Sequence, residues 1–255
     1  MSQTLEYAKF LDEAARTGQA VPQIDPEGKL TLDDAYAIQS ASIQRRVERG
    51  ERRVGVKMGF TSRAKMVQMG IADVIWGRLS SDMLIEESTP IKFSRFVHPR
   101  VEPELAFVLK KPLAGIVTEV EALAAVEAIA PALEIIDSRY KDFKFSLSDV
   151  IADNASSSGF VIGPWGDPYQ DFSNLGMVMS IDGRAVQIGS TAAILGHPLR
   201  SLVAAARLSA AAGEPLQAGW VVMAGGATPA EWLKPGQYVS VEIERLGVAG
   251  FHVGE

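Results

Sequence analysis

Three glutamates in two apolar segments are the residues of this sequence best suited to chemistry. Glu102 and Glu104 are one residue apart at the start of VEPELAFVL, and Glu134 lies among apolar neighbours in PALEII. Side chains at i and i+2 of a strand share a face, and carboxylates this close repel each other. The chain has no cysteine and only three histidines. Converging carboxylates without such ligands suit a hard divalent cation, magnesium or manganese.

Each of these residues also has a structural interpretation. Glu102 and Glu104 could protect an exposed strand edge, and Pro103 between them, which has no N–H for a ladder, favours an edge or a bulge. Glu134 could form a salt bridge with an arginine, because a buried carboxylate without a partner is strongly destabilising. The scattered histidines are more typical of structural positions than of ligands.

Lys57 is the second anomaly, because it stands between Val56 and Met58 in the segment GVKMGF. A half-buried lysine can neutralise an acid, hold an anionic substrate or act as a base with a lowered pKa. Thr61 and Ser62 follow at an expected helix start, where backbone N–H groups can bind a carboxylate.

Composition restricts the class of protein. The 255 residues are 47% hydrophobic, enough for one large domain or two small ones. The net charge of −6, without a basic stripe, argues against nucleic acid as a partner. The N-terminus is amphipathic and acidic, without the apolar core of a signal peptide, and no apolar run approaches the ~20 residues of a membrane span. We therefore expect a cytoplasmic protein with no membrane segment.

The pattern of elements predicts an α+β fold. Helical spacing and capping signals predict helices over residues 2–17, 31–50, 62–69, 118–129 and 198–212. Expected strands cover residues 101–109, 132–137, 159–163, 175–181, 219–224 and 237–244, and Asp182-Gly183 predicts a hairpin. This divides the chain into a helical N-terminal region, 1–75, and a mixed β catalytic core, 76–255, which we expect to form one continuous structural unit.

The chain resembles the hydratase and decarboxylase branch of the fumarylacetoacetate-hydrolase-like superfamily. The resemblance covers almost the whole chain, in the segments GVKMGFTSRAKM, IWGRLSSDM, HPRVEPELAF, ALEIIDSR, IADNASSSGFVIG and LGHPLRSLVAAARL. It implies a mixed β-sheet core of the fumarylacetoacetate-hydrolase C-terminal-domain type. The family's metal motif falls on Glu102, Glu104 and Glu134, and its active-site lysine falls on Lys57. An aspartate of the family falls on Asp82, as a proton carrier or a structural hydrogen-bonding group.

Within this branch the residues favour a decarboxylase. Hydratases tend to read GKKIGLTS followed by D-F-G-x-L, whereas this chain has GVKMGFTS and Trp76-Gly77-Arg78-Leu79; the lysine typical of hydrolases is absent from IADNASSS. The resemblance implies a magnesium- or manganese-dependent carboxy-lyase without an organic cofactor. It would convert 2-oxohex-3-enedioate to 2-hydroxypenta-2,4-dienoate, or its keto form 2-oxopent-4-enoate, and CO2 in the meta-cleavage degradation of aromatic compounds.

The resemblance also suggests contacts and alternatives. Thr61, Ser62 and Ser157 would lie near the substrate, and Trp76 would be an apolar wall for the departing carboxylate or an ordinary core residue. The alternative functions are a hydratase of 2-oxopent-4-enoate that uses the same metal site, and a non-catalytic partner that stabilises such a hydratase. We also expect a homo-oligomer and a complex with a homologous hydratase. A plain dicarboxylate-binding protein is disfavoured, since binding an anion alone would favour arginine and lysine.

Overall fold

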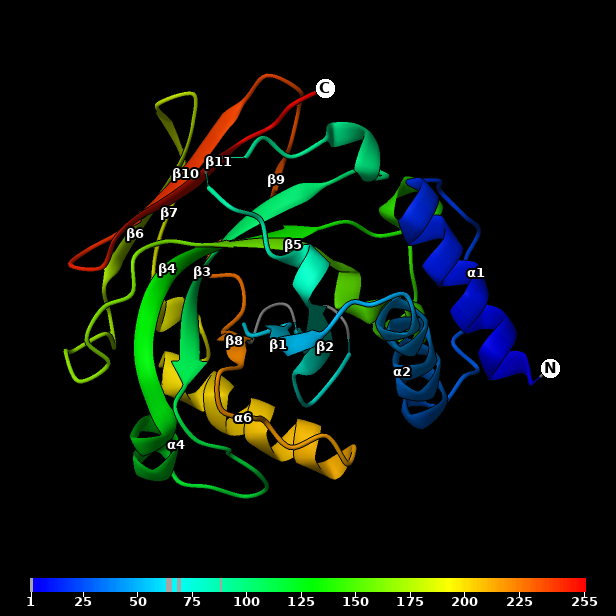
Figure 1. Ribbon diagram of the computed structural model, residues 1–255, viewed down its shortest axis with the longest axis horizontal. Coiled ribbons are helices and arrows are strands. Elements are labelled where there is room, and N and C mark those ends of the chain that lie inside the picture. The colour runs from blue at the N-terminus through cyan, green and yellow to red at the C-terminus, as the bar shows by residue number, and fades with distance from the viewer. Residues whose placement is uncertain (1, 63–65, 68–69, 88) are drawn as a thin grey trace.

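The computed structural model describes residues 2–62, 66–67, 70–87 and 89–255. Two N-terminal helices lie on one side of a curled seven-stranded sheet, and a separate four-stranded sheet stands on the other side (Figure 1). The predicted α+β class is confirmed. Among the residues described, no helix combines the length and the apolar composition that a membrane span needs. The helices are α1 (Gln3–Thr17), α2 (Leu32–Glu48), α4 (Glu119–Ala125), α5 (Leu147–Ala152) and α6 (Pro198–Ala211).

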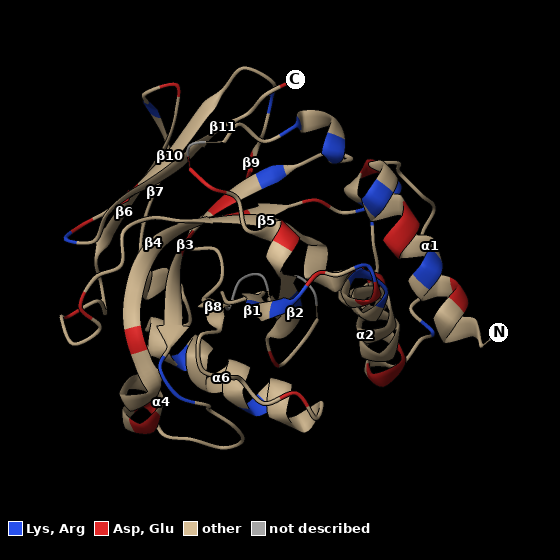
Figure 2. Ribbon diagram, viewed as in Figure 1, with Lys and Arg blue, Asp and Glu red and all other residues tan. Residues whose placement is uncertain are grey.

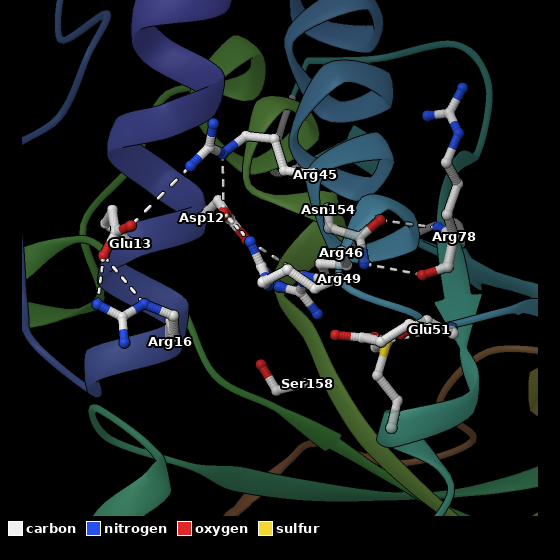
Figure 3. A network of polar contacts seen from close by, with 12 residues as sticks. Asp12, Glu13, Arg16, Arg45, Arg46, Arg49, Glu51, Arg78, Asn154 and Ser158 are labelled. Carbon is white, nitrogen blue, oxygen red and sulfur yellow. Dashed lines mark hydrogen bonds and ion pairs between the residues drawn. The ribbon is translucent and has the colours of Figure 1, made fainter.

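Helices α1 and α2 pack together through apolar residues and a buried carboxylate. Basic and acidic residues alternate along α1 (Figure 2), and Asp12, on its inner face, is only 1% exposed. Asp12 accepts one hydrogen bond from Arg45, at 2.9 Å, and two from Arg49, at 2.7 and 2.6 Å (Figure 3). Burial alone would raise the pKa of Asp12, but these arginines outweigh it and hold the pKa below its ordinary value.

We expect Asp12→Asn to lower the free energy of unfolding near neutral pH by about 1–3 kcal/mol. The loss is moderate because Arg45 and Arg49 are 33% and 40% exposed and keep contact with water. The depressed pKa means that the carboxylate stabilises the fold above its unfolded pKa of about 3.9, and that this contribution is lost as the pH falls through the folded value. Urea unfolding at neutral and at acid pH should therefore give a smaller difference between the two proteins in acid.

The large sheet has the order β2-β1-β8-β3-β4-β5, and β9 pairs with the start of β3. Strand β3 is central, with β4 along one side and β8 and β9 along the other. Pro103 lies in the gap between β8 and β9, where its missing N–H breaks no ladder bond. The strands are β1 (Arg53–Gly59), β2 (Ile75–Ser80), β3 (Arg100–Leu109), β4 (Val126–Ile136), β5 (Ser157–Ile162), β8 (Val221–Met223) and β9 (Glu231–Trp232).

The large sheet curls until its two ends meet. After β2 the chain passes β5, where Leu84 forms a bridge with Phe160 and the Ile85 N–H donates to the Phe160 carbonyl at 2.9 Å. The curl gives the sheet an inner face, on which the charged residues of β1, β3 and β4 converge. The outer face packs on α6 and on the four-stranded sheet, which consists of β6 (Gly176–Ile181), β7 (Arg184–Ser190), β10 (Tyr238–Ile243) and β11 (Gly247–His252).

Most predicted elements are confirmed, with several differences. The capping box of α2 and the hairpin at Asp182-Gly183 are present, but helix α5 and strands β1, β2, β9 and β11 were not predicted. The helix expected over 118–129 is wrong beyond residue 125, since the chain enters β4 at Val126. The helix expected over 62–69 falls largely outside the described residues. Strand β1 comes before residue 75 yet pairs with β8 from the C-terminal part, and the division at residue 75 stays a proposal.

Candidate metal centre

Glu102, Glu104 and Glu134 converge on the inner face of the curled sheet. Glu102 stands directly opposite Glu134 in the β3–β4 ladder, and Glu104 is two residues further along β3. One carboxylate oxygen from each residue lies within 4.8 Å of the other two, and all three residues are buried. The strand pairing explains this convergence, since directly opposite side chains and i, i+2 neighbours share one face. The exposed-edge interpretation of Glu102 and Glu104 is therefore wrong.

Glu104 has the least satisfied carboxylate of the cluster. Its Oε2 accepts a hydrogen bond from the Gly225 N–H at 2.7 Å, whereas its Oε1 is buried without a hydrogen-bond partner among the described residues. Burial and the nearby Glu134 carboxylate raise the pKa of Glu104 well above its ordinary value, although Lys57 opposes them. A buried carboxylate oxygen without a donor is costly unless a cation binds it. The three carboxylates thus fit a hard divalent cation.

Lys57 of β1 supplies the positive charge of this cluster. Its Nζ lies 2.9 Å from Glu134 Oε2 and donates to the Ala155 carbonyl at 3.0 Å. Glu134 is thus paired with a lysine and not with an arginine. Burial alone would lower the pKa of Lys57, but the carboxylates of Glu134, Glu104 and Glu102 raise it above its ordinary value. This pairing supports the expected role of Lys57 as a cation that neutralises an acid.

A strained turn holds the cluster from the side of β5. Asn154, Ala155 and Ser156 have φ values of 54°, 50° and 58°, three successive non-glycine residues in the left-handed region. Each such residue costs roughly 1–2 kcal/mol, and strain of this kind gathers at functional sites. The turn brings the Ala155 carbonyl to Lys57. It passes so close to β2 that a Cβ at Gly77 would lie 2.6 Å from the Asn154 carbonyl oxygen.

A cavity of about 730 Å³ opens beside the cluster. Lys57 and Glu102 form part of its wall, together with Arg100, Lys144 and Ser156. The remaining wall is mostly apolar and aromatic, and no aspartate or histidine is among the described residues that line it. The Oγ of Ser156 and the Nε of Arg100 are buried without hydrogen-bond partners in the described part of the chain. A concave, largely apolar space with a few unsatisfied polar groups is typical of a small-ligand site.

Two residues expected at the site lie elsewhere. Trp76 is buried against α2, stacked on Tyr36 with ring centroids 5.6 Å apart, and does not line the cavity. Strand β2 alternates, so its neighbour Ile75 faces the cavity instead. Asp82 is exposed in the turn Ser81–Met83 and lines a different cavity, of about 370 Å³, between the N-terminal helices and the sheet. Neither side chain is brought to the glutamates.

The predicted hydroxyl residues lie near the cluster but outside the lining of the cavity. Ser157 donates to Glu134 Oε1 at 2.8 Å, and it is Ser156 that reaches the cavity. Thr61 is buried against Gly225: a Cβ added to Gly225 would lie 2.2 Å from the Oγ1 of Thr61. Thr61 therefore lies close to the Gly225 N–H that binds Glu104. Ser62 is half-buried, and its carbonyl accepts a hydrogen bond from the Met66 N–H at 3.0 Å.

The sequence matches the family described as fumarylacetoacetate (FAA) hydrolase C-terminal over residues 53–253. The matched range spans β1 to β11 and includes all three glutamates and Lys57. The chain belongs to this family. The resemblance found from the sequence is confirmed, and so is the predicted fold of the fumarylacetoacetate hydrolase type.

Relatives within the fumarylacetoacetate hydrolase family carry two kinds of name. A 4-oxalocrotonate decarboxylase of a Pseudomonas species is 61% identical over 244 residues, which cover 96% of this chain and 95% of the relative. A 2-keto-4-pentenoate hydratase of Paraburkholderia xenovorans is 38% identical over 246 residues, 95% of this chain and 91% of the relative. The solved structure of 4-oxalocrotonate decarboxylase from Pseudomonas putida G7, complexed with magnesium and adipate, matches with a TM-score of 0.95 and 36% identity, covering 98% of this chain and 97% of that chain.

Proposed function

We propose that this chain is a divalent-metal-dependent carboxy-lyase that decarboxylates 2-oxohex-3-enedioate. The products are CO2 and 2-hydroxypenta-2,4-dienoate, or its keto form, and the reaction belongs to the meta-cleavage degradation of aromatic compounds. The observation that carries the proposal is the cluster of Glu102, Glu104 and Glu134 around Lys57, at the wall of a cavity, in a chain 61% identical to a 4-oxalocrotonate decarboxylase.

Glu102, Glu104 and Glu134 would hold the cation, and we propose magnesium or manganese. The orphaned Oε1 of Glu104 and the all-oxygen donor set support a hard dication. When bound, such an ion supplies a Lewis acid that stabilises negative charge on a 2-oxo acid, a contribution of several kcal/mol. Ser157 holds Glu134 in place through its hydrogen bond, and Gly225 does the same for Glu104.

Lys57 stabilises the charge that develops when the carbon–carbon bond breaks. The electrons of the C5–C6 bond move through C4 and C3 to the C2 oxygen as CO2 leaves, and one proton then gives the 2-hydroxy product. An ammonium group has three N–H donors; among the described residues, Glu134 and Ala155 receive two of them, and we assign the third to a substrate oxygen. The contacts of Nζ with a carboxylate and a carbonyl oxygen are those of an ammonium group, so Lys57 acts as a hydrogen-bond donor and cation.

Hydration of 2-hydroxypenta-2,4-dienoate is the second candidate function, because a hydratase is 38% identical over nearly the whole chain. Adding water requires a base for the water and an acid for carbon. The titratable residues among the described cavity lining are Lys57, Arg100, Glu102 and Lys144, without histidine or aspartate. A bound cation can activate water, so the choice rests on the relatives: the 61% identity to a decarboxylase, against 38% to the hydratase, favours decarboxylation.

A CO2-release assay tests the proposed function. Purified protein should release CO2 from 2-oxohex-3-enedioate with added Mg2+, should lose this activity with EDTA, and should regain it when Mg2+ or Mn2+ is restored. Water addition to 2-hydroxypenta-2,4-dienoate, without CO2 release from the diacid, would assign the hydratase function instead. Turnover of neither substrate, together with binding of a hydratase, would favour the non-catalytic partner.

We expect Gly226→Ala to weaken Mg2+ binding about 10- to 100-fold. A Cβ at residue 226 would lie 2.7 Å from the carboxyl carbon of Glu102 and would displace that carboxylate. Gly176→Ala is the matched control, since the nearest atom to its Cβ would be a Glu244 oxygen at 3.9 Å. Calorimetric titration with Mg2+ measures both; an unchanged affinity of Gly226→Ala would contradict the position given to Glu102.

Assembly and location are also part of the proposal. We propose a homo-oligomer that acts in the cytoplasm on a small 2-oxo dicarboxylate and forms a complex with a homologous hydratase. The relation to hydratases supports such a partnership, since the two chains would share one fold and one type of site. Light scattering of the purified protein, alone and mixed with a hydratase, tests both associations.

A further inference from the structure

Arg100 lies at the start of β3, on the wall of the cavity that Glu102 also lines. Its guanidinium is held between two aromatic rings, with its Cζ 4.0 Å from the centroid of Phe143 and 3.8 Å from that of Trp232. Trp232 is the cross-strand neighbour of Arg100 in the β3–β9 ladder, and the two rings meet edge to face at 6.0 Å. With the centroids 6.0 Å apart, the two rings subtend about a right angle at Cζ, so they cover adjoining sides of the guanidinium and leave its other sides open.

Aromatic rings attract a guanidinium without accepting its N–H groups in ordinary hydrogen bonds, so those on the sides left open by the rings remain for a ligand. The side chain of Arg100 forms neither a hydrogen bond nor an ion pair with any described residue, and its Nε is buried without a partner. Its pKa is lowered by burial, while the Glu102 carboxylate opposes this effect. Arg100 is half-buried, and a charged side chain with a buried donor that the described residues leave unsatisfied points to a ligand that completes it.

The position of Arg100 fits the second end of a dicarboxylate. Residues Arg100, Glu102 and Glu104 alternate along β3, so they share a face, and successive members are roughly 6–7 Å apart along the strand. An extended six-carbon diacid, with bonds of about 1.5 Å each, spans a similar length between its two ends. One end at the glutamates would place the other at the planar fork of Arg100, which matches a carboxylate in two parallel hydrogen bonds.

We infer that Arg100 binds the far carboxylate of the substrate and makes the site selective for 2-oxo dicarboxylates over 2-oxo monocarboxylates. This inference rests on the proposed function and names the residue that recognises its substrate class. Both aromatic rings remain beside the guanidinium after the carboxylate has left as CO2. Arg100 thus contributes to binding, with little interaction that is gained in the transition state.

The test compares two ligands that differ only in the far carboxylate, 2-oxohexanedioate and 2-oxohexanoate. Both are saturated between C3 and C4 and have no path for the electrons of decarboxylation. We expect calorimetry with Mg2+ present to show that the wild-type protein prefers the diacid. Arg100→Gln should lose about 10- to 100-fold in affinity for the diacid and keep its affinity for the monoacid. Arg100→Lys, which keeps the charge without the fork, should recover only part of the loss.

Two further measurements separate this inference from its rivals. Lys144 is an exposed cation on the same cavity wall; if Lys144→Gln lost the preference for the diacid and Arg100→Gln did not, Arg100 would not be the anchor. With 2-oxohex-3-enedioate, Arg100→Gln should raise KM by a similar factor and leave kcat unchanged or higher, because the ion pair with the departing carboxylate stabilises the ground state. If the protein released no CO2 but showed the Arg100-dependent preference for the diacid, only the proposed reaction would be overturned. If Arg100→Gln lost the same affinity for the diacid and the monoacid, the inference about Arg100 would be overturned.

Discussion

Glu104→Gln should reduce kcat/KM for 2-oxohex-3-enedioate by about 10³-fold or more, because it removes one of three oxygen donors to the cation. Stabilisation of charge by a bound metal contributes several kcal/mol, and about 1.4 kcal/mol corresponds to a tenfold change in rate. Glutamine has the same shape and can still accept the hydrogen bond from the Gly225 N–H that Glu104 receives at 2.7 Å. The fold should therefore survive the change.

The same variant should be at least as stable as the wild type when EDTA is present. Burial and the neighbouring Glu134 raise the pKa of Glu104. When the folded pKa of a carboxyl group is raised, its protonated form favours the fold, and this advantage is lost as the pH rises through the folded pKa. Ionised Glu104 therefore destabilises the metal-free fold at neutral pH. Addition of Mg2+ should raise the Tm of the wild type by mass action and that of Glu104→Gln much less.

Glu127→Gln is the matched control, since Glu127 is an exposed residue of β4, the strand that also holds Glu134. The control should keep both the activity and the Mg2+-dependent rise in Tm. If Glu104→Gln turned over substrate at nearly the wild-type rate under saturating Mg2+, Glu104 would not be a metal ligand. A variant that unfolds in EDTA would show instead that the ionised carboxylate is needed for the fold.

The metal-binding chemistry of this site could be predicted from the sequence because it depends on the two-residue alternation of side chains along a β-strand. Alternation of two residues placed Glu102 and Glu104 on one face, and the apolar context of Glu134 required a partner for its charge. The same alternation extends to Arg100, two residues before Glu102 in HPRVEPEL. Arg100 was nevertheless missed, since its role depends on Phe143 and Trp232, which come from distant parts of the chain.

Strands β1 and β2 could not be found from periodicity. Strand β1 carries glycines at positions 55 and 59, and β2 is buried on both faces, so neither shows the polar alternation of a half-exposed strand. Without β2, the sequence also could not tell whether Trp76 or Ile75 faces the cavity. Helix α4 illustrates the opposite case: its cap at Thr118 was predicted, but pairing of Val126 with Leu109 of β3 overrides the helical pattern that continues past it.

Replacing Lys57 by methionine should lower both the activity and the free energy of unfolding. Glu104→Gln, in contrast, should leave the free energy of unfolding in EDTA unchanged or raise it. Lys57 is 3% exposed and lies 2.9 Å from Glu134 Oε2. Loss of one member of a buried ion pair leaves the other charge without compensation and costs about 3–5 kcal/mol. Removal of the donor to the developing oxyanion should reduce kcat about 10²- to 10³-fold. Circular dichroism in urea and steady-state kinetics measure the two effects.

Lys9→Met is the control for the stability measurement, because Lys9 is exposed on α1 and the substitution suits a helix. It should change the free energy of unfolding by no more than about 0.5 kcal/mol. A Lys57→Met protein with reduced stability but unchanged kcat and KM would assign Lys57 a structural role only. A lower kcat in an equally stable protein would mean that Glu134 does not depend on this lysine for its charge.

The effects of Glu104→Gln and Lys57→Met both depend on the charges of one buried cluster. The double variant, which combines the two substitutions, tests this dependence. In the wild type, the carboxylates of Glu134, Glu104 and Glu102 raise the pKa of Lys57. Each carboxylate therefore increases the contribution of the Lys57 charge to the free energy of unfolding. With glutamine at position 104, fewer negative charges need Lys57, and Lys57→Met should then cost less stability than it does in the wild type. Because the residues share one buried network, their effects in EDTA should be non-additive by about 1–3 kcal/mol. Strict additivity would mean that Lys57 and Glu104 do not share one electrostatic cluster, and it would contradict the proposed cation site between the glutamates.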